Sequence, residues 1–218
     1  MRERFEKQMQ KLNNQLMTMG STAEQAIRSA ITALQKQDAS AAENARRLEE
    51  ELDGQERDIE TLCLKLILEQ QPVAGDLRQI SSALRMITDL ERIGDQAADI
   101  AELAMRLYGQ TFIKPITHLP QMAQQAMKMV TGSIDAFITH DLATAEAVWD
   151  MDTTVDNFFD TIKNELIALI RKDASNGEQA VDLLMIAKYL ERIGDHAQNL
   201  SEWVIYSLTG THKGGETQ

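Results

Sequence analysis

Four pairs of carboxylates recur along this chain at the spacing of one helical turn. The pairs are Glu49/Asp53, Glu91/Asp95, Asp152/Asp156 and Glu191/Asp195. Side chains four residues apart lie on the same face of an α-helix, so each pair presents two carboxylates in one direction. Oxygen ligands suit hard divalent ions such as Mg, Mn and Ca, and bridging carboxylates also suit iron. The spacing therefore predicts acidic sites that hold cations.

Two of these pairs lie in a repeated hexapeptide, Leu-Glu-Arg-Ile-Gly-Asp, which begins at Leu90 and again at Leu190. A glycine inside a helix costs about 1 kcal/mol relative to alanine, so its use in both copies predicts close approach of a neighbouring helix or a ligand. Asp99 extends the first acidic stripe by one turn, whereas Asn199 stands at the matching place of the second.

These patterns give a set of candidate site residues. The expected metal ligands are Glu49, Asp53, Glu91, Asp95, Asp99, Asp152, Asp156, Glu191 and Asp195, and the supporting motif residues are Arg92, Gly94, Arg192 and Gly194. The expected cofactor is a divalent or transition metal, with Fe, Mn, Mg, Zn and Ca all open. No catalytic residue is expected.

Ordinary surface ion pairs are the competing interpretation of the same residues. Arg92 could pair with Asp89 or Asp95, and Arg192 with Asp195, as solvated bridges that contribute little to stability. His196 follows Asp195, but the sequence favours a solvated side chain over a ligand at this position.

The elements that carry these pairs form an internal repeat. Ala30–Asp53 matches Ser133–Asp156 at an offset of 103 residues, and the offset falls to 100 at the hexapeptides. A loop in between, QQPVAGDLR in the first copy and RKDASNGEQ in the second, is therefore expected to be three residues shorter in the second. A duplicated unit explains this better than chance.

Each unit is predicted to contain three helices, from apolar residues spaced three or four apart. In the first unit, one helix ends near Gln37, the next is capped by Asp38 or Ser40, and Asp76 caps the third. In the second unit the helices span about 119–139, 142–172 and 177–208. The expected fold is all-α, with two tandem three-helix bundles of six long antiparallel helices. Residues 1–109 form the first repeat, 110–118 a linker, 119–208 the second repeat and 209–218 a disordered tail.

Composition limits the partners. The net charge is −12 over 218 residues, which disfavours binding to nucleic acid or anionic lipid. One cysteine, Cys63, excludes an internal disulfide and fits a reducing compartment. No segment has the length and hydrophobicity of a membrane span or a signal peptide. We expect a cytoplasmic protein that does not insert directly into a membrane.

The two hexapeptides, the QQPVAGDLR turn after a cysteine-containing segment, and the acidic pairs together resemble the PhoU family over nearly the whole chain. The resemblance implies a homodimer of two-repeat chains without enzymatic activity. It implies signal transduction in phosphate homeostasis, in which the protein couples a phosphate ABC transporter ATPase to a phosphate-sensing histidine kinase. The implied outcome is negative regulation of phosphate uptake and of the phosphate-starvation regulon. Some members hold metal clusters on acidic motifs, which here are the four pairs.

Two alternatives remain open from the residues. One is a carboxylate-bridged dimetal enzyme built on a helical bundle, in which a Glu-x-x-His motif supplies ligands. None of the four histidines has a glutamate three residues before it, which argues against that enzyme. The other is a structural adaptor that binds no metal.

Overall fold

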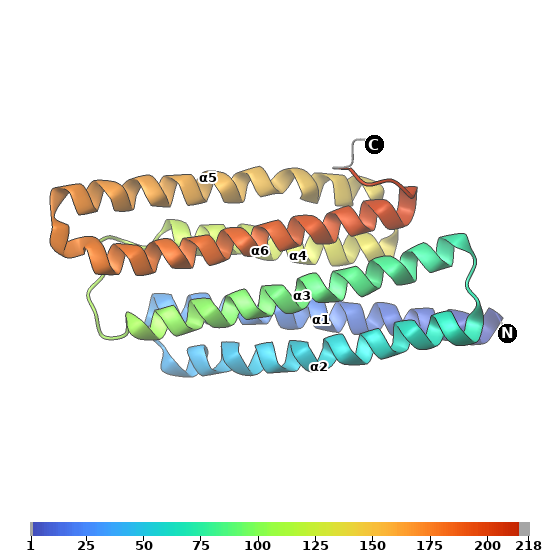
Figure 1. Cartoon of the computed structure of the whole chain (residues 1–218). Coiled ribbons are helices and arrows are strands. Elements are labelled where there is room, and N and C mark those ends of the chain that lie inside the picture. The colour runs from blue at the N-terminus through green and yellow to red at the C-terminus, as the bar shows by residue number, and fades with distance from the viewer. Residues whose placement is uncertain (1, 214–218) are drawn as a thin grey trace.

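The protein is a pair of antiparallel three-helix bundles, seen in a computed structural model that describes residues 2–213 (Figure 1). The helices are α1 (Arg2–Lys36), α2 (Ala39–Gln70), α3 (Ala74–Arg106), α4 (His118–Thr139), α5 (Leu142–Lys172) and α6 (Gly177–Thr209). A short 3-10 helix, Ala174–Asn176, precedes α6, and the described residues contain no β-strand. The all-α prediction is confirmed.

The two bundles pack side by side along their length. Helices α1, α2 and α3 form the first and α4, α5 and α6 the second, with α3 against α6 and α1 against α4 (Figure 1). Leucine and methionine side chains spaced three or four residues apart on α1, such as Leu12, Leu16 and Met19, have no exposed surface. Their burial drives the helices together, because apolar area removed from water contributes about 25 cal/mol per Å². No helix among the described residues has both the length and the hydrophobicity to cross a membrane.

Matching turns begin the second helix of each bundle. Gln37 and His140 both adopt the left-handed conformation that ends a helix, and an aspartate follows each. The Asp38 carboxylate accepts hydrogen bonds from the Ser40 and Ala41 amides at 2.9 and 3.2 Å. Asp141 accepts one from the Thr144 amide at 3.1 Å. Asp38 rather than Ser40 is therefore the N-cap of α2.

Two details of the third helices differ from the sequence expectation. Val73, not Asp76, is the N-cap of α3, and Asp76 instead lies in the first turn, where its charge complements the helix dipole. The connection between α5 and α6, residues 173–176, is no shorter than residues 71–73 between α2 and α3. The second unit is shorter because its third helix is shorter ahead of the hexapeptide: α6 begins about one turn nearer to its hexapeptide than α3 does.

The segment between the bundles is tied to both of them. The Gln37 side chain donates to the Gln110 carbonyl at 2.7 Å and accepts from the Gly109 amide at 2.9 Å. From α6, Gln179 accepts from the Ile113 amide at 2.6 Å and donates to the Thr111 carbonyl at 3.2 Å. These bonds satisfy backbone groups that the turn would otherwise leave to water.

Residues 209–218 were expected to form a disordered tail, but Thr209 is the last residue of α6. Beyond Gly210, which caps the helix, the His212 ring stacks on Tyr206 with 4.4 Å between ring centroids. The remainder of the expected tail, 214–218, lies outside the described residues.

Candidate functional site

The first acidic set lies where α2 faces α3. Its four carboxylates, Glu49 and Asp53 from α2 and Glu91 and Asp95 from α3, are all half-buried. Burial, followed by the negative charges of Asp53 and Asp95, raises the pKa of Glu49 above its ordinary value. Burial and Asp95 likewise raise the pKa of Glu91, with smaller contributions from Glu56 and Asp53. The fold therefore brings the two predicted pairs of this repeat close enough to repel one another.

The second set, between α5 and α6, contains a buried acid. Asp152 is only 8% exposed, and its Oδ1 has no hydrogen-bond partner among the described residues. Burial, with Asp156, Asp195 and Glu191 as further causes, raises the pKa of Asp152 to about 6. Partial burial and Glu191 raise the pKa of both Asp156 and Asp195, although these two side chains still reach solvent.

The glycines of the hexapeptides mark the closest approach of the paired helices. A Cβ on Gly94 would lie 2.6 Å from Leu52 Cδ1 on α2. A Cβ on Gly194 would lie 2.9 Å from Val155 Cγ1 and 3.1 Å from Asp152 Oδ1. The close approach predicted at both glycines is therefore made by a neighbouring helix, and it occurs beside the acids.

The basic residues differ between the two sets. In the first, Arg92 lies 3.2 Å from Asp95 Oδ2 and 3.5 Å from Glu91 Oε2. In the second, Lys188 pairs with Glu191, while the charge of Arg192 acts on Asp99 in the other repeat. The first set is thus partly neutralised by its own motif arginine, and the second by a lysine outside the motif.

Asp99 stands apart from the other expected ligands because it faces the contact between the repeats. Burial, Asp95 and Glu102 raise its pKa, whereas Arg192 and a hydrogen bond with Tyr189 oppose that rise. In the matching region, Asn199 Nδ2 donates to Asp89 Oδ1 at 3.2 Å. The replacement of an acid by Asn199 therefore has a structural reason, namely an acceptor opposite it.

Asp89 was not predicted as a residue of the contact between the repeats. His196 was expected to be solvated, whereas His196 Nδ1 lies 2.9 Å from Asp89 Oδ1. The signal that could have found it is the exchange of residue types at equivalent positions, aspartate at 89 against tyrosine at 189.

The carboxylate oxygens of both sets are suitable ligands for a hard cation, but the side chains are not arranged to bind one. Within residues 2–213, no three His, Cys, Asp or Glu side chains are arranged to hold a metal ion. The carboxylates are close enough to interact but do not converge on one point. The orphaned Asp152 Oδ1 and the small Gly194 beside it make the second set the better fit, because a cation would supply the missing partner of that oxygen.

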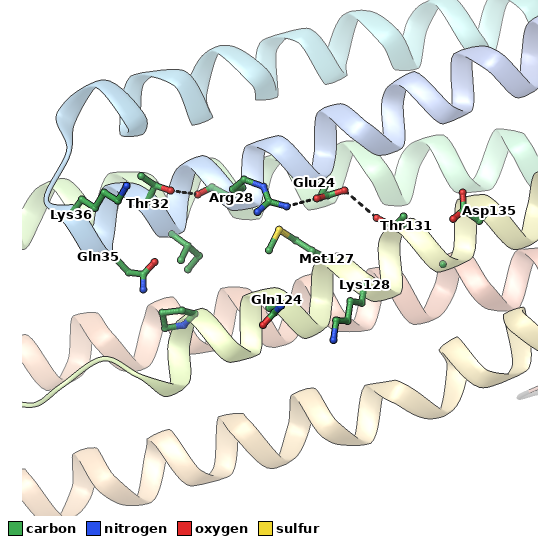
Figure 2. A pocket seen from close by; sticks show the side chains of 13 residues that line it. Glu24, Arg28, Thr32, Gln35, Lys36, Gln124, Met127, Lys128, Thr131 and Asp135 are labelled. Atoms are coloured by element: carbon green, nitrogen blue, oxygen red, sulfur yellow. Dashed lines mark hydrogen bonds and ion pairs between the residues drawn. The ribbon is translucent and has the colours of Figure 1, made fainter.

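A groove of about 830 Å³ lies between α1 and α4 (Figure 2). Its charged side chains partly neutralise one another, since Glu24 pairs with Arg28 at 2.5 Å and accepts a hydrogen bond from Thr131 at 3.2 Å. None of the expected site residues lines it.

A family model for the PhoU domain matches the chain twice, over residues 16–104 and 119–204. Each match falls on one bundle and includes its hexapeptide. This chain belongs to the PhoU family. The resemblance to this family, and the fold of repeated three-helix bundles that it implied, are confirmed.

Similar proteins agree with this assignment. A PhoU homologue of the phosphate-specific transport system from Clostridium acetobutylicum is 38% identical over 210 residues, covering 96% of each chain. The crystal structure of PhoU from Pseudomonas aeruginosa superposes with a TM-score of 0.90 at 32% identity, over 95% of this chain and 100% of that one. The phosphate transport system regulatory protein PhoU from Streptococcus pneumoniae gives 0.87 at 25% identity, over 95% and 98%.

Proposed function

We propose that this chain is a cytoplasmic negative regulator of phosphate uptake that links a phosphate ABC transporter to a phosphate-sensing histidine kinase. The observation that carries the proposal is the match of both repeats, at almost full length, to relatives named as accessory proteins of a phosphate-specific transport system. A double bundle with no catalytic constellation recognised in its described part suits an adaptor, whose work is contact with other proteins.

A genetic test addresses this function directly. In a bacterium whose own PhoU gene is deleted, a phosphate-starvation reporter should be expressed even in phosphate-rich medium, and this chain should repress it again. Pull-downs with the transporter ATPase and the kinase cytoplasmic region should retain both. A well-expressed chain that neither represses the reporter nor retains either protein would contradict the adaptor role.

A second copy of this chain is a further proposed partner. Large apolar side chains are exposed at the turn between α2 and α3, where Leu68 is 80% and Val73 72% exposed. Such surface on a monomer favours association. Light scattering at several protein concentrations should give the mass of a dimer, and a monomer mass throughout would overturn this proposal.

We also propose that the acidic sets bind divalent or transition metal. Glu49, Asp53, Glu91 and Asp95 would hold it in the first repeat, and Asp152, Asp156, Glu191 and Asp195 in the second. The metal would supply positive charge that offsets carboxylate repulsion, which reaches about 4 kcal/mol for two charges 4 Å apart at an effective dielectric of 20. Asp99 is left out of this set because its contacts lie with the other repeat.

Elemental analysis of protein purified without chelator or affinity metal tests the metal proposal. Wild type should carry stoichiometric metal, and the Asp95→Asn/Asp195→Asn variant should lose it because each set loses a charged ligand. A matched control, Asp58→Asn/Glu146→Gln, removes two exposed acids from α2 and α5 and should retain the metal. Absence of metal from wild type under several supplied ions would leave the hexapeptides as a packing feature.

A further inference from the structure

The contact between the repeats contains two polar clusters related by the internal duplication. In the first cluster, Asp89 from α3 accepts a hydrogen bond from Asn199 Nδ2 at 3.2 Å and lies 2.9 Å from His196 Nδ1. The Asp89 and His196 side chains are only 14% and 26% exposed. One carboxylate thus meets two side chains from α6.

The second cluster contains the residues at the equivalent positions, 100 residues away in each case. Tyr189 occupies the place of Asp89, and Asp99 that of Asn199. Tyr189 hydrogen-bonds with Asp99, and Arg192 supplies positive charge to the same carboxylate. The central pair of the first cluster is Asp89 with Asn199, and that of the second is Tyr189 with Asp99. Each central pair therefore contains one acid.

Pairing of like repeats would break this arrangement. Two first repeats, brought together in the same geometry, would place Asp89 of each opposite Asp99 of the other. Like charges placed opposite each other destabilise an interface, and more so where water is partly excluded. Two second repeats would have no acid at the central pair, where Tyr189 would meet Asn199.

We propose that the surface between the repeats accepts only the unlike repeat and excludes dimers in which like repeats of two chains pair. The polar clusters act against pairs of first repeats, and a dimer of like repeats would contain such a pair. Such a surface combines attraction to the correct partner with repulsion of the wrong one.

A double-mutant cycle of isosteric changes tests the polar part. Asn199→Asp places a second acid against Asp89 and should lower the melting temperature by about 2–6 °C, and Asp89→Asn, which removes the acid, should lower it by about 2–4 °C. The combined variant again has one acid per cluster and should recover to within about 2 °C of wild type. If the decreases in melting temperature of the single variants simply add in the combined variant, or if the single variants melt like wild type, the proposed preference for the unlike repeat is wrong.

Exchange of repeats between chains tests the specificity itself. Two differently tagged chains are unfolded and refolded together, or refolded separately and then mixed, and the fraction captured through both tags is compared. Joint refolding of wild type sets the reference, since exchange of unlike repeats and a dimer through another face both add to its captured fraction. Asp89→Asn/Asn199→Asp should be captured about twofold more after joint refolding, because pairs of like repeats become a second route to a mixed dimer. Glu146→Gln, an exposed change, should behave as wild type. Equal captured fractions for wild type and the double variant would refute the proposal.

Discussion

Replacing Asp152 with Asn should stabilise the metal-free protein at pH 7.5 by about 2–3 kcal/mol, because folding raises the pKa of its carboxyl from 3.8 to about 6 and a tenfold change in proton affinity corresponds to about 1.4 kcal/mol. The carboxyl is 8% exposed, and burial with nearby acids raises its pKa from 3.8 to about 6. A raised pKa means that the folded protein holds the proton more tightly than the unfolded chain. The stability that this proton contributes is full below pH 3.8 and is lost as the pH rises through 6.

Urea unfolding in the presence of a chelator measures this effect. The difference between Asp152→Asn and wild type should be about 1 kcal/mol at pH 4.5, where the unfolded carboxyl is already mostly ionised, and should reach its full size at pH 7.5. Glu146→Gln, an exposed change on the same helix, should shift the free energy of unfolding by no more than about 0.5 kcal/mol at either pH. A destabilised Asp152→Asn variant at pH 7.5 would mean that the charged carboxylate has a favourable partner.

Gly194→Val should lower the free energy of unfolding by about 3 kcal/mol, at the upper end of the range for overpacking a helix contact. The new Cβ alone would lie 2.9 Å from Val155 Cγ1, and the β-branched Val155 has little freedom to move away. The same substitution at Gly54, inside α2, meets no atom within 4 Å of the new Cβ.

Denaturant unfolding of the two variants side by side separates packing from helix propensity. Gly54→Val should be neutral or slightly stabilising, by about 0.5 kcal/mol, since valine forms helix better than glycine. Similar free energies of unfolding for the two variants would show that the helices can separate at the hexapeptide without loss.

Features within one helix could be predicted from the sequence. The repeat and its 103-residue offset predicted two equivalent bundles, and Asp38 was among the predicted caps because capping is a local interaction of a carboxylate with nearby amides. The acidic pairs were predicted from spacing within each helix, and the structure brings those of α2 and α3 together, since the charges of Asp53 and Asp95 both raise the pKa of Glu49.

Features that depend on a third helix could not be predicted. Asp95 and Asp99 are one turn apart on α3, yet Asp95 acts within the first bundle and Asp99 contacts α6. Spacing fixes which residues share a helical face, but a broad face can contact two neighbours. Val73 was missed as the cap of α3 because it makes no side-chain hydrogen bond that its residue type could signal.

Because both repeats lie in one chain, each repeat can acquire substitutions that the other does not share. In a dimer of identical repeats, both equivalent contacts would contain the same residues, so Asp89 opposite Asn199 in one contact and Tyr189 opposite Asp99 in the other could not arise. Here Lys188 binds an acid of its motif, while its counterpart Thr88 donates to Glu56 at 3.1 Å. Under the proposed metal binding, the two acidic sets can diverge in affinity within a single gene, and one polypeptide would then respond to two different concentrations of the same ion.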